Sequence, residues 1–244
     1  MIPGPYVWLA WSSAFLLPWG LLYWRFPAHR HAMILASVFT APFGLTEPLF
    51  VPRYWNPPSL FDLAQRTGFD VESLIFCFGI GGVGAVLVNV LTQRIAVPVG
   101  SAERHHPTHR LHRWVLFSPS VVFLVLLPVG WNPIYPGIVA MLIGAVLSAW
   151  CRPDLSRHAL LGGLVFLIYY MVFLTGLDFT APTGYIAEVW NLEDLSGLSL
   201  GFMPLEELLF AVAFGSYWAG AYEHVTWRRA IRIGSEGTPA RTDT

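Results

Sequence analysis

An acidic pair, Glu206-Glu207, follows Pro204 where a long apolar stretch begins near the C-terminus. Proline suits the first turn of a helix, and carboxylates in that turn interact favourably with the helix dipole. One interpretation is therefore a capped helix start at a membrane surface. The other is an acid–base site. Neighbouring carboxylates in a low-dielectric environment cannot all ionise, so one keeps its proton near neutral pH, as an acid catalyst of an apolar substrate requires.

The surroundings of this pair occur twice. The stretch 46–76 resembles the stretch 175–210, because each runs from an acidic residue at a helix end, through a Trp-Asn loop and a Gly-Phe dipeptide, into a helix that begins with Glu. Glu72 corresponds to Glu206 in this comparison. We expect the two helix-starting carboxylates to converge near a pseudo-two-fold axis.

Four carboxylates are the candidate catalytic residues: Glu206 or Glu207 as the proton donor, and Glu72 or Asp178 as the base or a second acid. The candidate substrate-binding residues are Phe210, Trp190, Phe76, Tyr217, Asn191 and Trp55. Aromatic faces beside buried acids could stabilise a carbocation. The alternative is ordinary helix packing, since aromatic residues make up 15% of the chain.

Two further motifs could suggest a cofactor or a metal. The stretch Gly79 to Gly84 matches G-x-G-x-x-G, but it follows no strand and lies in an apolar helix, which favours close helix packing over nucleotide binding. The histidines between His105 and His112 lack the paired boxes that membrane di-iron oxygenases carry on separate helices. A loop rich in Arg and His beside anionic lipid needs no metal. We therefore expect no metal and no cofactor, with a histidine-based oxygenase as an alternative that bound iron would reveal.

Membrane helices must position these residues. Hydrophobic residues make up 55% of the chain and charged residues 12%, with a mean hydropathy of +0.55, whereas soluble domains carry about 25% charged residues. The two cysteines lie in or beside apolar segments, which argues against a disulfide framework. Apolar runs long enough to cross a bilayer are predicted at about 5–24, 32–51, 71–91, 114–131, 133–150, 158–179 and 203–222.

The predicted fold is an all-α integral membrane protein with seven transmembrane helices, built as a parallel duplication of a three-helix unit (3+1+3). A single membrane domain covers residues 1–227. Within it, repeat one lies at about 5–91, a linking helix at about 114–131 and repeat two at about 133–222. The tail, residues 228–244, is predicted to be basic and disordered.

The arginines predict the orientation. If seven spans alternate, twelve of the fourteen basic residues fall on one side: Arg25, Arg30, Arg94, Arg104, Arg110, Arg113, Arg152, Arg157, Arg228, Arg229, Arg232 and Arg241. The other side holds Arg53 and Arg66. The positive-inside rule then places the C-terminus in the cytoplasm and the N-terminus outside, in a multi-pass cell-membrane protein. Ten acidic residues fall on or near the outer half: Glu47, Asp62, Asp70, Glu72, Asp178, Glu188, Glu193, Asp194, Glu206 and Glu207.

The stretch "VWNLEDLSGLSLGFMPLEELLFAV" resembles the membrane lycopene cyclases of the heterodimeric or fused type. The residues that carry the resemblance are Trp190, Gly197, Leu198, Pro204, Glu206, Glu207 and Phe210. The resemblance is good over about 160–222 and weaker over about 32–91, so the chain looks like the fused single-chain form. Its first half is degenerate, because Asp70-Val71-Glu72-Ser73 stands where the family has Pro-x-Glu-Glu.

The resemblance implies a cofactor-independent, acid-catalysed cycloisomerisation of linear polyene ends to ionone-type rings through a carbocation. It implies a lipophilic polyene substrate drawn from the bilayer, with membrane lipid as a partner and no nucleic acid. A homo-oligomer or contact with other carotenoid enzymes is a further candidate interaction. Two alternatives stay open: a terpenoid cyclase or hydratase acting on another polyprenyl substrate, and a small proton-coupled membrane transporter.

Overall fold

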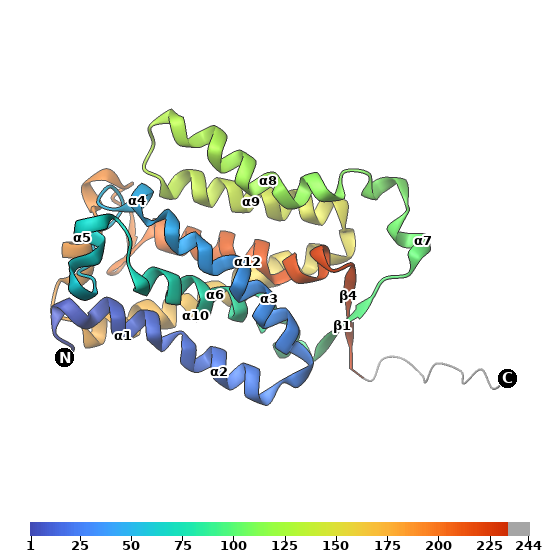
Figure 1. Ribbon diagram of the computed structural model, residues 1–244, viewed down its shortest axis with the longest axis horizontal. Coiled ribbons are helices and arrows are strands. Elements are labelled where there is room, and N and C mark those ends of the chain that lie inside the picture. The colour runs from blue at the N-terminus through green and yellow to red at the C-terminus, as the bar shows by residue number, and fades with distance from the viewer. Residues whose placement is uncertain (234–244) are drawn as a thin grey trace.

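The computed structural model describes residues 1–233 as a bundle of helices with two short two-stranded sheets (Figure 1). The helices are α1 Val7–Ala14, α2 Leu16–Arg25, α3 Arg30–Thr40, α4 Glu47–Phe50, α5 Leu63–Thr67, α6 Val71–Leu91, α7 Ser101–Arg104, α8 His112–Leu126, α9 Ile134–Cys151, α10 Ser156–Thr180, α11 Tyr185–Val189 and α12 Leu205–Val225. The strands are β1 Arg94–Pro98, β2 Ser199–Leu200, β3 Met203–Pro204 and β4 Arg228–Arg232. A 3-10 helix, η3 (Ala41–Thr46), joins α3 to α4.

All seven segments predicted as spans are helical, and five helical stretches are long and apolar enough to cross a membrane: Pro27–Phe50, Val71–Leu91, His112–Val129, Ile134–Cys151 and Pro153–Thr180. The first predicted span is divided into α1 and α2 at Phe15. The last, α12, carries Glu206, Glu207 and Glu223, which lower its hydropathy. The chain therefore has the helices of a membrane protein, and seven crossings stay a prediction.

Helices α6 and α12 form the centre of the bundle. Helix α12 packs on α9, α10 and α6, while α6 also packs on α3, and α8 packs on α9 (Figure 1). The glycine-rich stretch of α6 allows this approach, because a side chain at Gly81 would collide with Thr40 of α3 and one at Gly84 would meet Phe214 of α12. The prediction that these glycines serve helix packing is confirmed.

The C-terminal ends of α6 and α12 have the same local structure. Two residues after each helix ends, a residue with a left-handed backbone, Gln93 (φ 53°) or Trp227 (φ 54°), leads into a strand. The strands β1 and β4 pair antiparallel. One turn earlier, Asn89 Nδ2 donates to Glu223 Oε1 at 2.6 Å, across a sequence separation of 134. Residues 134 positions apart in the sequence thus meet in space.

The two ends of the bundle differ in charge, as the arginine pattern predicts. Helix α7 and strands β1 and β4 lie at one end, while α4 and α5 lie at the other (Figure 1). Arg53 follows α4 in the sequence and Arg66 lies in α5. Residues 228–232 form β4, so this part of the predicted disordered tail is ordered. It is ordered because its backbone pairs with β1, a partner that local sequence does not reveal. Residues 234–244, including Arg241, lie outside the described residues.

Candidate active site

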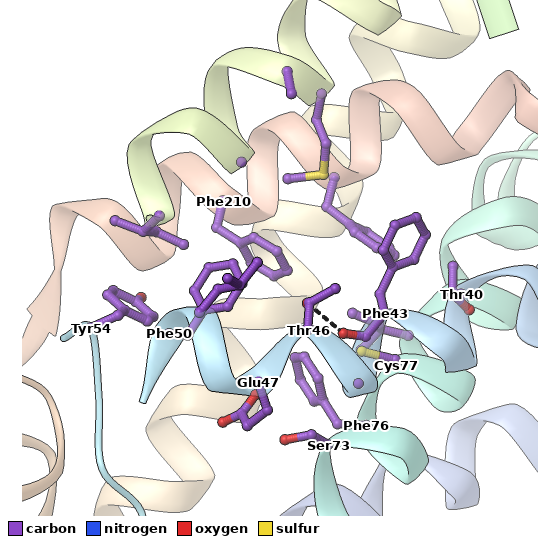
Figure 2. Close-up of a pocket in the computed structure, with 18 of the residues that line it drawn as sticks. Thr40, Phe43, Thr46, Glu47, Phe50, Tyr54, Ser73, Phe76, Cys77 and Phe210 are labelled. Carbon is purple, nitrogen blue, oxygen red and sulfur yellow. Dashed lines mark hydrogen bonds between the residues drawn. The ribbon is translucent and has the colours of Figure 1, made fainter. Parts of the chain in front are cut away.

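A cavity of about 450 Å³ lies between η3–α4 and α6 on one side and α8, α9, α10 and α12 on the other (Figure 2). Its walls are mostly aromatic and aliphatic side chains. Among the described residues that line it, Glu47 and Glu207 are the only residues with carboxyl side chains, and no Arg or His lines it. The volume falls within the range of about 300–1,000 Å³ that small-molecule pockets occupy.

Aromatic rings surround the acidic end of this cavity. Trp55 and Trp190, in the two Trp-Asn loops, form an antiparallel β-bridge, and their ring centroids lie 5.4 Å apart. Trp8 meets Trp55 edge-on at 4.6 Å. On the opposite side, Tyr170 and Phe210 lie 5.7 Å apart. Such π faces can stabilise a cation in a desolvated site.

Glu207 lies in the first turn of α12, is 4% exposed, and accepts three hydrogen bonds. Trp190 Nε1 donates to its Oε1 at 2.6 Å, the Tyr54 hydroxyl donates to the same oxygen, and the Tyr170 hydroxyl donates to Oε2 at 2.7 Å. Burial, followed by the charge of Glu207, raises the pKa of Tyr54 well above its ordinary value, so this hydroxyl keeps its proton and donates. Three converging donors fix the position of this carboxyl group.

Glu47 is the other carboxyl group in the wall. It begins α4, where Pro48 follows it in the first turn, and it is 6% exposed. Figure 2 shows its side chain on the side of α4 that faces Ser73 and Phe76. Its Oε1 is buried without a hydrogen-bond partner among the described residues. The two wall carboxyls thus have different surroundings, one held by three donors and one with an unpaired oxygen.

The pair Glu72 and Glu206, predicted to converge, lies outside this cavity. Glu72 Oε1 accepts a hydrogen bond from the backbone N–H of Leu60 at 2.7 Å, and Glu206 Oε1 accepts one from that of Ser196 at 2.9 Å. Tyr135 also donates to Glu206 Oε1 at 2.7 Å. Each carboxylate therefore fastens the loop that precedes its own helix.

Two other predicted site residues also lie away from the cavity. Asp178 is half-buried on α10 and does not line it. Asn191 Nδ2 donates to the carbonyl of Arg53 at 3.2 Å and to Asp194 Oδ2 at 3.1 Å, so it joins the two Trp-Asn loops. The predicted residues that do line the cavity are Glu207, Phe210, Trp190, Phe76, Tyr217 and Trp55.

Glu47 is a wall carboxyl group that was not among the site residues predicted from sequence. It stands at the start of the first repeated stretch, and its place at an apolar helix end was a usable signal. The apparent match between Glu72 and Glu206 drew the prediction away from it.

The cavity reaches the outer surface of the bundle between η3 and α8. Phe43 of η3 and Leu124 of α8 both line it, and they are 53% and 65% exposed. Both segments belong to stretches that are long and apolar enough to cross a membrane. The mouth therefore faces the region that lipid would occupy, and an apolar molecule could reach the carboxyl groups without passing through water.

Residues 132–225 match the lycopene cyclase family model. This match covers α9, α10 and α12 and ends with the last turn of α12, so it contains Glu207, Tyr170 and Trp190. A domain of this kind implies a cyclase enzyme and suggests carotenoid cyclase activity. No curated protein and no solved structure matches the chain.

Proposed function

We propose that this chain is a carotenoid cyclase that converts linear lycopene-type ends into rings by acid–base catalysis. The observation that carries the proposal is the pair of carboxyl groups, Glu47 and Glu207, in the wall of an aromatic cavity that opens between apolar helices. The lycopene cyclase match over 132–225 supports the same chemistry.

In the proposed mechanism Glu47 is the acid. It protonates the terminal double bond of the polyene end, and the neighbouring double bond attacks the resulting cation to close a six-membered ring. A positioned proton donor of this kind contributes about 10²–10⁴-fold in rate.

Glu207 is the proposed base, which removes a proton from the cyclised cation. Three donors converge on its carboxyl group, and hydrogen bonds of this kind favour a carboxylate. The reaction is an isomerisation, so Glu47 loses one proton and Glu207 gains one. Before the next turnover Glu47 must take up a proton from solvent and Glu207 must release one to it. Trp55, Trp190 and Phe210 are placed to stabilise the cation through their π faces.

The substrate is proposed to approach from the bilayer. Phe43 and Leu124 frame a mouth on the apolar surface, and the cavity of about 450 Å³ suits one ring-forming end while the rest of the polyene stays in lipid. A homo-oligomer or contact with other carotenoid enzymes would bring the product of one step to the next.

We also propose the 3+1+3 duplication with seven crossings, the N-terminus outside and the C-terminus cytoplasmic. Three observations support the duplication: the β1–β4 pairing, the contact between Asn89 and Glu223, and the bridge between Trp55 and Trp190. The arginine-rich end at β1 and β4 supports the orientation.

A hydratase or a cyclase of another polyprenyl substrate would use the same carboxyl groups. A hydratase needs water at the cation, however, and the lining of the cavity is largely carbon. The opening to lipid favours loss of a proton over capture of water.

The test is expression of the chain in a host that accumulates lycopene, with chromatography and mass spectrometry of the pigments. Cyclic carotenoids of unchanged mass are expected from the wild-type chain, and unchanged lycopene from a Glu47→Gln/Glu207→Gln double variant present at equal level in the membrane. Products heavier by one water would point to a hydratase. Unaltered lycopene with the folded wild-type chain would contradict the proposal.

A further inference from the structure

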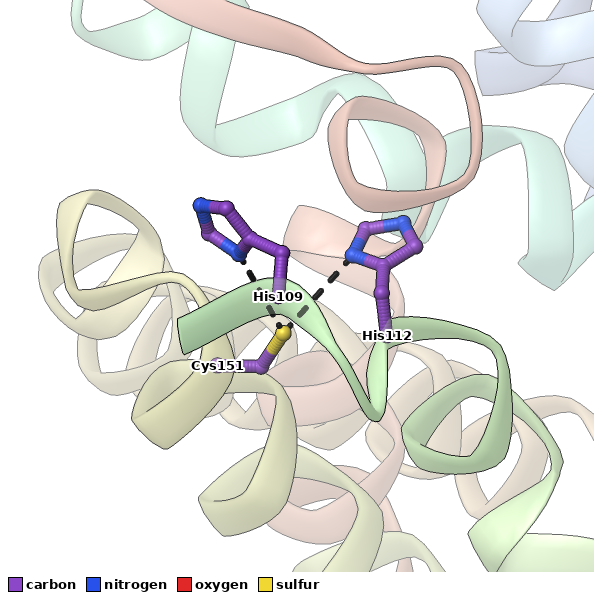
Figure 3. A group of neighbouring side chains, drawn as sticks. All are labelled: His109, His112 and Cys151. Atoms are coloured by element: carbon purple, nitrogen blue, oxygen red, sulfur yellow. Dashed lines mark hydrogen bonds between the residues drawn. The ribbon is translucent and has the colours of Figure 1, made fainter. Parts of the chain in front are cut away.

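Two histidines and a cysteine meet at the far end of the bundle from the cavity (Figure 3). His109 lies just before α8, His112 begins α8, and Cys151 ends α9. The Nδ1 atoms of His109 and His112 lie 3.6 Å and 3.7 Å from Cys151 Sγ, and the three atoms lie within 4.8 Å of one another. The sequence hides this cluster, because the cysteine follows the histidines by a whole helical hairpin.

The two sulfur–nitrogen separations are those that a tetrahedral metal ion imposes on a thiolate and an imidazole ligand. Zn²⁺ binds thiolate sulfur at about 2.3 Å and imidazole nitrogen at about 2.0–2.1 Å. At a tetrahedral angle such bonds place nitrogen and sulfur about 3.6 Å apart. Both measured distances agree with this value.

The ring of His112 is held as a metal ligand requires. Its Nε2 lies 3.1 Å from the backbone carbonyl oxygen of His224, which can only accept, so Nε2 carries the proton. The lone pair of Nδ1 is then directed at Cys151. A metal-bound histidine commonly donates its other N–H to a carbonyl in this way. Trp227 stacks on the same ring at 3.9 Å and fixes its plane.

Cys151 is 1% exposed, and as a thiol it could donate its S–H to His112 Nδ1 and accept a hydrogen bond from His109 Nδ1–H. As a thiolate it could instead share a metal ion with both Nδ1 atoms. The neighbouring Arg152 is 1% exposed, and its guanidinium is paired with Asp154 at 2.7 Å. A thiolate that binds a metal ion satisfies both imidazole lone pairs at once.

We propose that His109, His112 and Cys151 bind Zn²⁺, with a fourth coordination position left for water or an exogenous ligand. The ion would hold the start of α8 against the ends of α9 and α12. It would thereby fix the segment that links the two halves of the chain. The proposal does not depend on the proposed cyclase activity.

Metal binding is measured on the full chain, purified in detergent, by elemental analysis and by titration of metal-stripped protein with Co²⁺. We expect about one Zn²⁺ per chain and a thiolate-to-Co²⁺ charge-transfer band. Cys151→Ser should remove the band, while Cys77→Ser, which changes the other cysteine of the chain, should retain it.

His109→Ala is a second test variant. Its side chain is half-buried, whereas Cys151 is buried, so the substitution disturbs the packing less. It should weaken Co²⁺ binding at least tenfold, while His105→Ala, at an exposed histidine, should leave binding unchanged. Zinc-free wild-type protein that gives no thiolate band with Co²⁺ would overturn the proposal. So would an equal band in folded Cys151→Ser protein.

Discussion

Glu207→Gln removes the proton-accepting carboxylate while leaving the packing in place, because an amide can take up the same hydrogen-bonding position. Trp190 Nε1 can only donate, and with Tyr54 it donates to Oε1, so the amide oxygen should take that position. The amide nitrogen then replaces Oε2 and donates to the Tyr170 hydroxyl, which can turn and accept. Each of the three contacts keeps one donor and one acceptor, and we expect the variant to fold.

The rate should nevertheless fall steeply. An amide of this kind cannot take up a proton at neutral pH, and the loss of a positioned acid–base group lowers the rate by about 10²–10⁴-fold. Glu207→Ala should instead damage the fold. It leaves three buried donors without an acceptor, at about 1–3 kcal/mol each. The total is about 3–9 kcal/mol, nearer the lower figure because two of the donors are hydroxyls that can turn.

The assay pairs thermal unfolding in detergent with conversion of lycopene by equal amounts of purified protein. Glu206→Gln is the matched control, since Glu206 is the neighbouring carboxylate and lies outside the cavity. Its amide oxygen can still accept from Ser196 and Tyr135. The reasoning is refuted if folded Glu207→Gln protein retains full activity, or if Glu206→Gln reduces activity as strongly.

Two further predictions concern the packing of α6 on α3 and the N-terminal cap of α6. Gly81→Val should destabilise the fold by about 1–3 kcal/mol, because its side chain would collide with Thr40. Gly20→Ala, where a Cβ meets nothing within 4 Å, should be neutral or stabilise by up to about 1 kcal/mol; equal effects on detergent unfolding would contradict this. Burial raises the pKa of Asp70, which caps α6, so the folded chain binds that proton more tightly than the unfolded chain. The free energy of unfolding should therefore fall as the pH rises through the raised pKa, and Asp70→Asn, which still caps, should lack that fall in a pH series of unfolding curves.

The helices could be predicted from sequence because each depends on a local property. Long apolar runs fixed α6, α9 and α10 to within a few residues of their observed ends. The strands β1 and β4 could not be predicted, since each depends on a partner strand 130 to 138 positions away, and five-residue runs beside long apolar helices do not stand out.

The candidate site was predicted only in part, because local sequence marks some of its residues while the roles of others depend on the folded structure. Glu207 stood out through its type and its place at a helix start, and the aromatic residues Trp55 and Trp190 stood out through the recurring Trp-Asn loop. Which carboxyl of the pair faces the cavity depends on the rotation of α12. The role of Glu72 depends on a backbone N–H that only the folded loop at Leu60 supplies.

The most direct test of the central claim is conversion of lycopene by the purified chain in D₂O. If Glu47 delivers a solvent-derived proton to the terminal double bond, each new ring should retain one deuterium, at the carbon that was protonated. Glu47→Gln protein should then yield neither rings nor labelled lycopene. Rings formed without deuterium, or full labelling by folded Glu47→Gln protein, would contradict acid-initiated cyclisation at this cavity.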